Sequence, residues 1–296
     1  MALITLTLNK YCVTINTRGG CVDRFTYGDT DIFRPRPPNN VIEDASLSGL
    51  FPMLPLVNRI RGNKFNCDGH WVQLPINEKD SQFFLHGDGW LSEWHLSDCN
   101  AQKVSLTLDK KTELYHYQAT LLYSLDEFGL SISLGVMNMG SPFPYSLGLH
   151  PYFICEPKDK VCFNAKGYWP EGQNNLPEDY QEKIPQCLDF TTPTNVPERW
   201  INNCFYAPEQ SVYINRIDPG LQINVFSKEN YWVLYRPVEF AESEASYMCF
   251  EPQQYPIDAH SQEAVPLLDK NQKSEIMLRV KVKQEPQATI KLETVI

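Results

Sequence analysis

Four short segments of the sequence place ionisable or amide side chains among aromatic and apolar residues. Asn58 and Arg59 lie in the proline-bounded apolar run 51–62, and His86 lies in the segment FFLHGDGW at 83–90. His150 lies in GLHPYF at 148–153, and Glu251 is followed by a proline in MCFEP at 248–252. Polar groups in such surroundings must be satisfied inside the protein or by a ligand. Each group alone is compatible with a structural role, but together they indicate a site for a small polar ligand.

Aromatic residues in the same segments narrow the class of ligand. Trp90 closes the segment that contains His86, and Tyr152 follows His150 by two positions. Aromatic faces stack on the C–H faces of sugar rings, while amide, guanidinium, imidazole and carboxylate groups match sugar hydroxyls. A sugar is therefore a fitting ligand for these residue types.

Motifs for cofactor or metal chemistry are absent from the sequence. It contains no GxxxxGK[ST] or GxGxxG phosphate loop, no HExxH and no GxSxG. The nine cysteines are scattered, with no CxxC pair and no spacing typical of zinc ligands. We expect neither a cofactor nor a metal.

Composition and charge exclude further classes. The 296 residues carry 36 acidic and 26 basic side chains, for a net charge of −10, which argues against a nucleic-acid partner. No run approaches the about 18 apolar residues that span a membrane, and the N-terminus does not resemble a signal peptide. We expect a cytoplasmic protein with free thiols, either a monomer or a homodimer.

The elements that position these residues are predicted to be strands. Apolar and polar residues alternate over 4–8, 12–16, 103–108, 130–136, 276–282 and 288–295, whereas no long stretch has an apolar stripe with helical spacing. Asp68-Gly69 predicts a hairpin between 64–67 and 70–74, and the turn at 218–220 predicts one between 212–217 and 221–226. Residues 156–202 are irregular and are interpreted as long loops over a sheet. The pattern predicts an all-β protein, one antiparallel β-sandwich domain over residues 1–296 with few short helices.

The order of four motifs, FPMLPLVNRIRGNKF, LHGDGW, GLHPYF and CFEPQQYPIDA, resembles the aldose 1-epimerase (galactose mutarotase-like) family over about residues 3–283. The resemblance implies a large antiparallel β-sandwich that interconverts the α and β anomers of aldohexoses without a cofactor. By this resemblance His150 corresponds to the general acid and Glu251 to the general base. Arg59 and His86 correspond to sugar-positioning residues, with Asn58 beside them.

The chemistry implied is removal of a proton from the C1 hydroxyl while the ring oxygen gains one. A carboxylate and an imidazolium on opposite sides of the C1–O5 unit suffice, each contributing on the order of 10²–10⁴-fold. Histidine suits the acid because its unperturbed pKa lies near neutrality. A nearby cationic Arg59 or His86 would keep Glu251 ionised.

Two positions depart from the family pattern. Asn202 takes the place of an aspartate that grips a sugar hydroxyl, so the resemblance does not imply a preference for galactose. Arg236 precedes a proline where some relatives have glutamine, which favours an anionic hexose, such as a phosphorylated one. The alternative is that Arg236 pairs with a carboxylate such as Glu239.

Two other classes of function remain open from the sequence. One is a non-catalytic sugar-binding or regulatory protein on the same fold, although binding alone does not require an acid–base pair. The other is a glycosidase, which needs a second carboxylate beside Glu251, with Asp88 and Asp258 as the available candidates.

Overall fold

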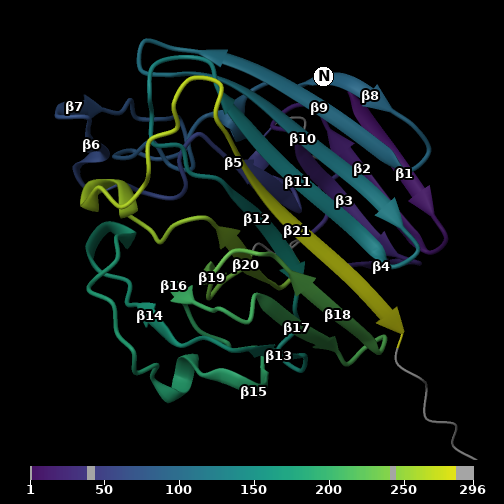
Figure 1. The fold of residues 1–296 in the computed structure, drawn as a ribbon. Helices are drawn as coiled ribbons and strands as arrows, with labels where there is room; N and C mark the ends of the chain where they lie inside the picture. Colours follow the sequence, from purple (N-terminus) through teal and green to yellow (C-terminus); the bar gives the residue numbers. More distant parts are fainter. Residues whose placement is uncertain (1, 39–43, 241–244, 285–296) are drawn as a thin grey trace, which may run out of the picture.

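The computed structural model describes residues 2–38, 44–240 and 245–284. Two large antiparallel sheets face each other in it (Figure 1). The first has ten strands in the order β1-β2-β3-β5-β12-β20-β19-β16-β14, with β4 paired to β3. Its strands are β1 (Leu3–Leu8), β2 (Tyr11–Asn16), β3 (Cys21–Tyr27), β4 (Thr30–Asp31), β5 (Leu50–Met53), β12 (Gly148–Ile154), β14 (Gly167–Trp169), β16 (Ile201–Tyr206), β19 (Tyr231–Arg236) and β20 (Tyr247–Gln253).

The second sheet has nine strands in the order β15-β13-β17-β18-β21-β11-β10-β9-β8. Its strands are β8 (His95–Cys99), β9 (Lys103–Lys111), β10 (His116–Asp126), β11 (Gly129–Asn138), β13 (Lys160–Phe163), β15 (Phe190–Asn195), β17 (Ser211–Arg216), β18 (Leu221–Phe226) and β21 (Lys273–Gln284). A separate hairpin pairs β6 (Lys64–Cys67) with β7 (His70–Gln73).

Helical structure in the described ranges is limited to short 3-10 helices. They are η1 (Ala45–Leu47), η2 (Arg61–Asn63), η3 (Gly89–Leu91), η4 (Gln173–Asn175), η5 (Gln186–Leu188) and η6 (Ala259–Gln262). In these parts of the chain no helix is long and apolar enough to cross a membrane. The two facing antiparallel sheets and the few short helices confirm the predicted β-sandwich.

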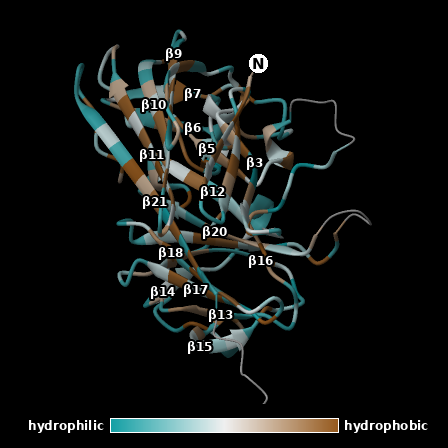
Figure 2. Ribbon diagram, turned by 90° about the vertical axis from the view of Figure 1, so that its right-hand side faces the viewer, coloured by the Kyte–Doolittle hydropathy of each residue, from teal (hydrophilic) through white to brown (hydrophobic). Residues whose placement is uncertain are grey.

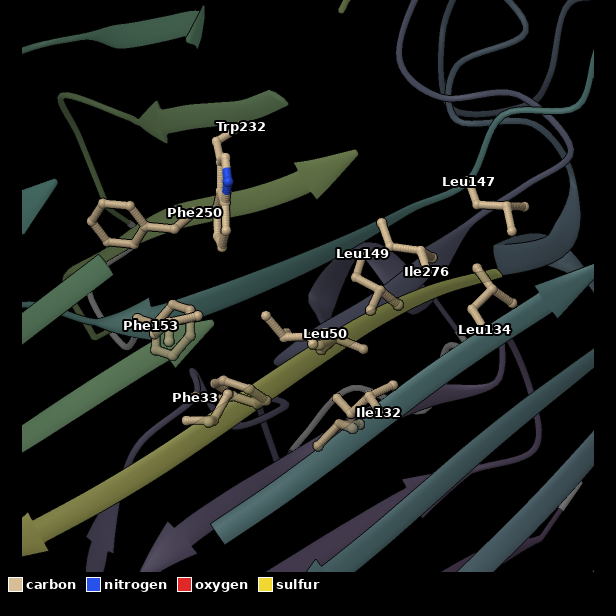
Figure 3. Close-up of a cluster of buried hydrophobic side chains, with 14 of the residues drawn as sticks. Phe33, Leu50, Ile132, Leu134, Leu147, Leu149, Phe153, Trp232, Phe250 and Ile276 are labelled. Carbon is tan, nitrogen blue, oxygen red and sulfur yellow. The ribbon is translucent and has the colours of Figure 1, made fainter. Parts of the chain in front are cut away.

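Alternation of burial along the strands builds the core between the sheets. In β10 every second residue from Tyr117 to Leu125 is buried, and Figure 2 shows hydrophobic and hydrophilic bands alternating along β10 and β11. Ile132 and Leu134 of β11 and Leu149 and Phe153 of β12 belong to one buried hydrophobic cluster between the sheets (Figure 3). The side chains on the opposite face of β12 do not contribute to this core.

Most predicted strands and both hairpins are confirmed. The segments 4–8, 12–16, 103–108, 130–136 and 276–282 fall within β1, β2, β9, β11 and β21, while 288–295 lies outside the described residues. Asp68 and Gly69 form the first hairpin turn with positive φ angles, and β17 pairs with β18 across the second turn. All nine cysteines are free thiols, as expected.

The interpretation of 156–202 as long loops is wrong in part. Strands β13 and β15 lie within it and join the second sheet, and β14 joins the first. β15 is an edge strand, the position where a sheet tolerates a proline such as Pro193. These strands are short, and pairing with distant strands rather than local alternation determines them.

Candidate active site

The pairing of β12 with β20 brings the two predicted acid–base residues together. Tyr152 pairs with Cys249, so two residues further along the antiparallel ladder His150 lies opposite Glu251. Directly opposed side chains on one face of such a pair lie close together. His150 Nε2 is 3.1 Å from Glu251 Oε1, and both side chains are buried.

The period-2 geometry of both strands aims the pair away from the core. Leu149 and Phe250, the neighbours of His150 and Glu251 along the chain, point into the space between the sheets (Figure 3). Because successive side chains of a strand point to opposite faces, His150 and Glu251 point to the other face of the sheet.

On that face lies a cavity of about 460 Å³. Eight of the nine site residues expected from the sequence line it, Arg236 being the exception. The lining residues are Arg34, Ser46, Leu47, Phe51, Asn58, Arg59, Lys79, Leu85, His86, Trp90, His150, Tyr152, Asn175, Trp200, Asn202, Val233, Tyr235, Tyr247 and Glu251. The volume falls in the usual range for small-molecule sites.

Two adjacent loops hold His86 in a defined tautomer. His86 N donates to the carbonyl of Asn58 (3.1 Å), and Asn58 N donates to His86 Nδ1 (3.3 Å). Since Nδ1 accepts, the ring proton of the neutral imidazole is on Nε2. Burial, with a smaller contribution from nearby His150, lowers the pKa of His86 well below its ordinary value. The expectation of a cationic His86 is therefore wrong, because it is a neutral N–H donor.

Gly87 allows the loop that carries His86 to contact the backbone of Leu54. Its φ is +72°, and a Cβ there would lie 2.2 Å from the Leu54 carbonyl oxygen. The same oxygen accepts hydrogen bonds from Asp88 N and Gly89 N, both at 3.0 Å. The positive φ and the close approach explain why the HGDG sequence suits this loop.

Arg59 lies on the cavity wall in contact with a carboxylate outside the cavity lining. Its Nη2 is 3.2 Å from Asp80 Oδ2, and both side chains are largely buried. The carboxylate of Asp80 also accepts from the backbone N–H groups of Gln82 and Phe83 (2.8 and 3.1 Å), which fixes its position. Arg59 is thereby oriented by the loop that precedes His86.

Aromatic rings fix the plane of the His150 imidazole. The ring contacts two neighbours on the same face of the sheet, Phe51 at 4.6 Å between centroids and 30°, and Tyr152 at 4.6 Å and 21°. Trp90 stacks on Phe51 at 4.7 Å. On Tyr152, the guanidinium carbon of Arg34 lies 3.8 Å from the ring centroid. The stack restricts imidazole rotation while leaving its edge toward the cavity.

Burial dominates the electrostatics of the acid–base pair. It lowers the pKa of His150 to about 3, with Arg34 acting in the same direction, and raises the pKa of Glu251 well above its ordinary value. The positive charge of Arg59 opposes the shift on Glu251. Charge on either group alone is disfavoured, so the pair holds one mobile proton and is neutral overall. The expectation of a histidine pKa near neutrality is wrong.

Asn202 is tied to a carboxylate at the cavity rim. Its Nδ2 donates to Glu171 Oε1 at 2.6 Å, and Trp200 Nε1 donates to Glu171 Oε2 at 2.5 Å. An aspartate at position 202 would place a second carboxylate against Glu171, with like charges in contact. This contact gives a physical reason for the amide, whose oxygen remains an acceptor for a ligand hydroxyl.

Arg236 is outside the cavity, so its expected role in binding an anionic sugar lacks structural support. Its buried guanidinium donates to the carbonyls of Pro197 (2.8 Å), Tyr247 (2.6 Å) and Cys155 (3.3 Å) and to Ser246 Oγ (3.0 Å). The alternative partner, Glu239, is not among these acceptors. Arg236 joins β19 and β20 to neighbouring backbone, a structural task that five fixed donors perform well.

Several cavity residues were not identified from the sequence. Arg34 and Lys79 bring positive charge, and Trp200, Tyr235 and Tyr247 add aromatic surface. Trp200 and Tyr235 stand close to Asn202 and Arg236, whereas the other three lie in segments that were not compared with the family pattern, and only the tertiary fold brings them to the cavity. The Pro-flanked position of Arg34 in FRPRPP was the sole local signal.

The comparisons agree with this architecture. The sequence profile of the family described as Aldose 1-epimerase matches residues 2–281. The uncharacterized protein YphB of Escherichia coli K12 is 30% identical over 265 residues, covering 88% of this chain and 90% of YphB. The structure of a candidate aldose 1-epimerase from Escherichia coli K12 superposes with a TM-score of 0.88 at 27% identity, covering 96% of this chain and 99% of that one. Galactose 1-epimerase from Lactobacillus acidophilus NCFM shares the fold, with a TM-score of 0.79 at 16% identity over 95% and 94% of the two chains. With a profile match over nearly its whole length, this chain belongs to the aldose 1-epimerase family.

Proposed function

We propose that this protein is a mutarotase, which interconverts the α and β anomers of an aldohexose by acid–base opening and closure of the ring. The observation that supports this most is the contact between His150 and Glu251 at the wall of a cavity that accommodates a small polar ligand. Binding alone does not require a buried imidazole and carboxyl in contact, which are costly to desolvate.

The first step needs Glu251 as a carboxylate and His150 as an imidazolium. The neutral pair reaches that state by moving its one proton from Glu251 to His150, with no exchange with solvent. Glu251 then takes the proton of the C1 hydroxyl while His150 protonates the ring oxygen, and the C1–O5 bond breaks. Rotation about C1–C2 presents the other face of the aldehyde, and closure reverses both transfers.

The two groups act side by side rather than from opposite sides of the sugar, as the sequence led us to expect. The ring oxygen and the C1 hydroxyl oxygen are bonded to the same carbon, so one edge of the pyranose presents both. An acid and a base 3.1 Å apart match that edge. The sugar replaces the direct contact between His150 and Glu251 with one hydrogen bond to each.

Neutral donors and aromatic rings hold the remainder of the sugar. His86 donates through Nε2, and Asn58, Arg59 and Asn202 line the same cavity, where Asn202 offers its amide oxygen. Such hydrogen bonds position the reacting edge against the acid–base pair.

A neutral aldohexose fits this cavity better than an anionic one. The observation that favoured an anion was Arg236, which bonds backbone carbonyls away from the cavity. Arg34, Arg59 and Lys79 line the cavity. Arg59 already pairs with Asp80, and Lys79 with Asp44 at 2.7 Å, so the charges of these two are largely balanced before any ligand binds. Arg34 Nη2 already donates to the carbonyls of Ser46 and Ser48 at 2.6 and 2.8 Å.

The glycosidase alternative lacks its second carboxylate. Glu251 is the sole carboxylate among the described residues that line the cavity. Asp88 accepts from the hydroxyls of Tyr115 and Tyr117 at 2.8 and 2.7 Å, and Asp258 bonds Arg61 at 2.7 and 3.1 Å. Both candidates are thus engaged elsewhere.

Polarimetry of freshly dissolved α-aldohexoses and their 6-phosphates tests this proposal. We expect enzyme-dependent acceleration for at least one neutral hexose and a slower rate for its 6-phosphate. Acceleration confined to the 6-phosphates would overturn the neutral-substrate assignment. Sugar binding without acceleration would favour the non-catalytic alternative over the mutarotase.

A further inference from the structure

A buried thiol completes a cluster of three different ligand types beside the cavity. Cys249 lies two residues before Glu251 on β20, so both side chains are on the same face of the sheet, where His150 is also found. One ligand atom from each of the three residues lies within 4.8 Å of the other two, and all three residues are buried. The sequence does not reveal this cluster, because about a hundred residues separate His150 from the other two.

A second observation points to an unsatisfied binding capacity at the same place. Nδ1 of His150 and Oε2 of Glu251 are buried, and within the described part of the chain neither has a hydrogen-bond partner. Buried polar atoms are nearly always paired, so the two side chains whose Nε2 and Oε1 lie 3.1 Å apart retain binding capacity that no described residue uses.

The donor set and its spacing suit zinc. An imidazole nitrogen, a thiolate sulfur and a carboxylate oxygen are the three protein ligand types that Zn²⁺ takes. With bonds of about 2.0–2.1 Å, a tetrahedral ion needs nitrogen and oxygen ligands roughly 3.3 Å apart. The His150–Glu251 separation of 3.1 Å is close to that value, and the Cys249 sulfur lies within 4.8 Å of the His150 and Glu251 ligand atoms.

We propose that His150, Cys249 and Glu251 form a binding site for zinc or a divalent cation of similar softness. Three protein ligands leave a fourth position, which His150 and Glu251 place toward the cavity. Binding releases the thiol proton of Cys249 and the shared proton of the His150–Glu251 pair to solvent, with no change of oxidation state.

The consequence for activity rests on the proposed function. A cation on His150 and Glu251 occupies the lone pairs that accept and return protons during ring opening. Zinc is therefore an inhibitor of this site rather than its cofactor, and it competes with the sugar.

Zinc binding by the purified full-length chain tests the site without any sugar. Titration of ZnCl₂ against a chromophoric chelator gives the affinity, and Co²⁺ gives a thiolate charge-transfer band when sulfur is a ligand. We expect one tight site per chain, weakened at least about tenfold in Cys249→Ala and in Glu251→Gln. Cys155→Ala is the matched control, because Cys155 is equally buried but outside the cluster, and it keeps the affinity.

The outcomes separate the site from the activity. Absence of a tight site, or equal affinity in the wild type and Cys249→Ala, would overturn the proposal. If Cys249→Ala does not fold by circular dichroism, the Co²⁺ spectrum of the wild type decides, and a spectrum without the thiolate band contradicts the site. Chelator-reversible inhibition of mutarotation supports the consequence. If the metal-free protein binds zinc tightly but does not accelerate mutarotation, the zinc site is supported and the proposed function is overturned.

Discussion

Replacement of Glu251 by glutamine removes one proton-transfer group and little else. The amide has the shape of the carboxyl, and its N–H can donate to His150 Nε2 across the same 3.1 Å contact. It cannot release or accept a proton, so the mobile proton of the pair is lost. The cavity wall keeps its packing because Glu251 is buried between neighbours on β12 and β19.

The size of the effect follows from the one function removed. General base catalysis contributes on the order of 10²–10⁴-fold, which is about 2.7–5.4 kcal/mol at ~1.36 kcal/mol per tenfold. Polarimetry of a fresh α-hexose measures the loss, and calorimetry of sugar binding shows that affinity changes only a few-fold. Burial raises the pKa of Glu251, so at neutral pH this carboxyl costs folding stability that a neutral amide does not, and we expect the free energy of unfolding of Glu251→Gln to be no lower than that of the wild type.

A matched control separates catalysis from the loss of any buried carboxyl. Glu229 is a partly buried carboxyl whose pKa burial also raises, and it lies outside the cavity. We expect Glu229→Gln to keep the wild-type rate. A Glu251→Gln variant that is folded and mutarotates at the wild-type rate would refute the assignment of Glu251 as the base.

Three further predictions concern the pH profile, Arg236 and Asn202. Burial lowers the pKa of His150 to about 3 and raises that of Glu251, so we expect the pair to keep its one mobile proton across neutrality. A plot of kcat/KM against pH should therefore show no histidine-like inflection between about pH 5 and 8. Arg236→Met leaves buried carbonyls without donors, so chemical denaturation shows a loss of about 3 kcal/mol, with no selective loss of 6-phosphate binding. Asn202→Asp weakens hexose binding measured by calorimetry, through repulsion from Glu171, and Glu171→Gln in the same chain restores it.

Each of these three predictions has an outcome that contradicts it. A fall of kcat/KM with an apparent pKa near the ordinary histidine value of 6.5 would show that His150 exchanges its proton with solvent. Normal stability of Arg236→Met with lost affinity for phosphorylated sugars would restore the anion-binding role. Equal affinity of the Asn202→Asp single and double variants would show that Glu171 does not explain the amide.

Local patterns in the sequence were sufficient for much of the fold. Period-2 alternation gave the long strands β9, β11 and β21, because one face of each is buried against the other sheet. Asp68-Gly69 identified a hairpin because these residues tolerate positive φ. The short strands β13 and β15 were not predicted from the sequence, since pairing with distant strands determines them.

In the candidate active site too, local motifs predicted some features and only the tertiary structure revealed others. His150 and Glu251 stand in recognisable motifs, but their direct contact follows from the register of β12 and β20, which no local signal gives. The sequence therefore could not show that burial shifts both pKa values and makes the pair a neutral unit. The sequence led us to expect Arg236 in the sugar site because it does not show on which face of β19 the side chain lies. It also does not show which carbonyls accept hydrogen bonds from the guanidinium.

Exchange between anomers at equilibrium tests the central claim most directly. NMR magnetisation transfer between the α and β C1 protons of an equilibrated aldohexose reports ring opening without any net reaction. We expect an exchange rate that rises in proportion to added wild-type protein and is lost with Glu251→Gln. Sugar that binds the protein, with exchange no faster than in buffer alone, would contradict it.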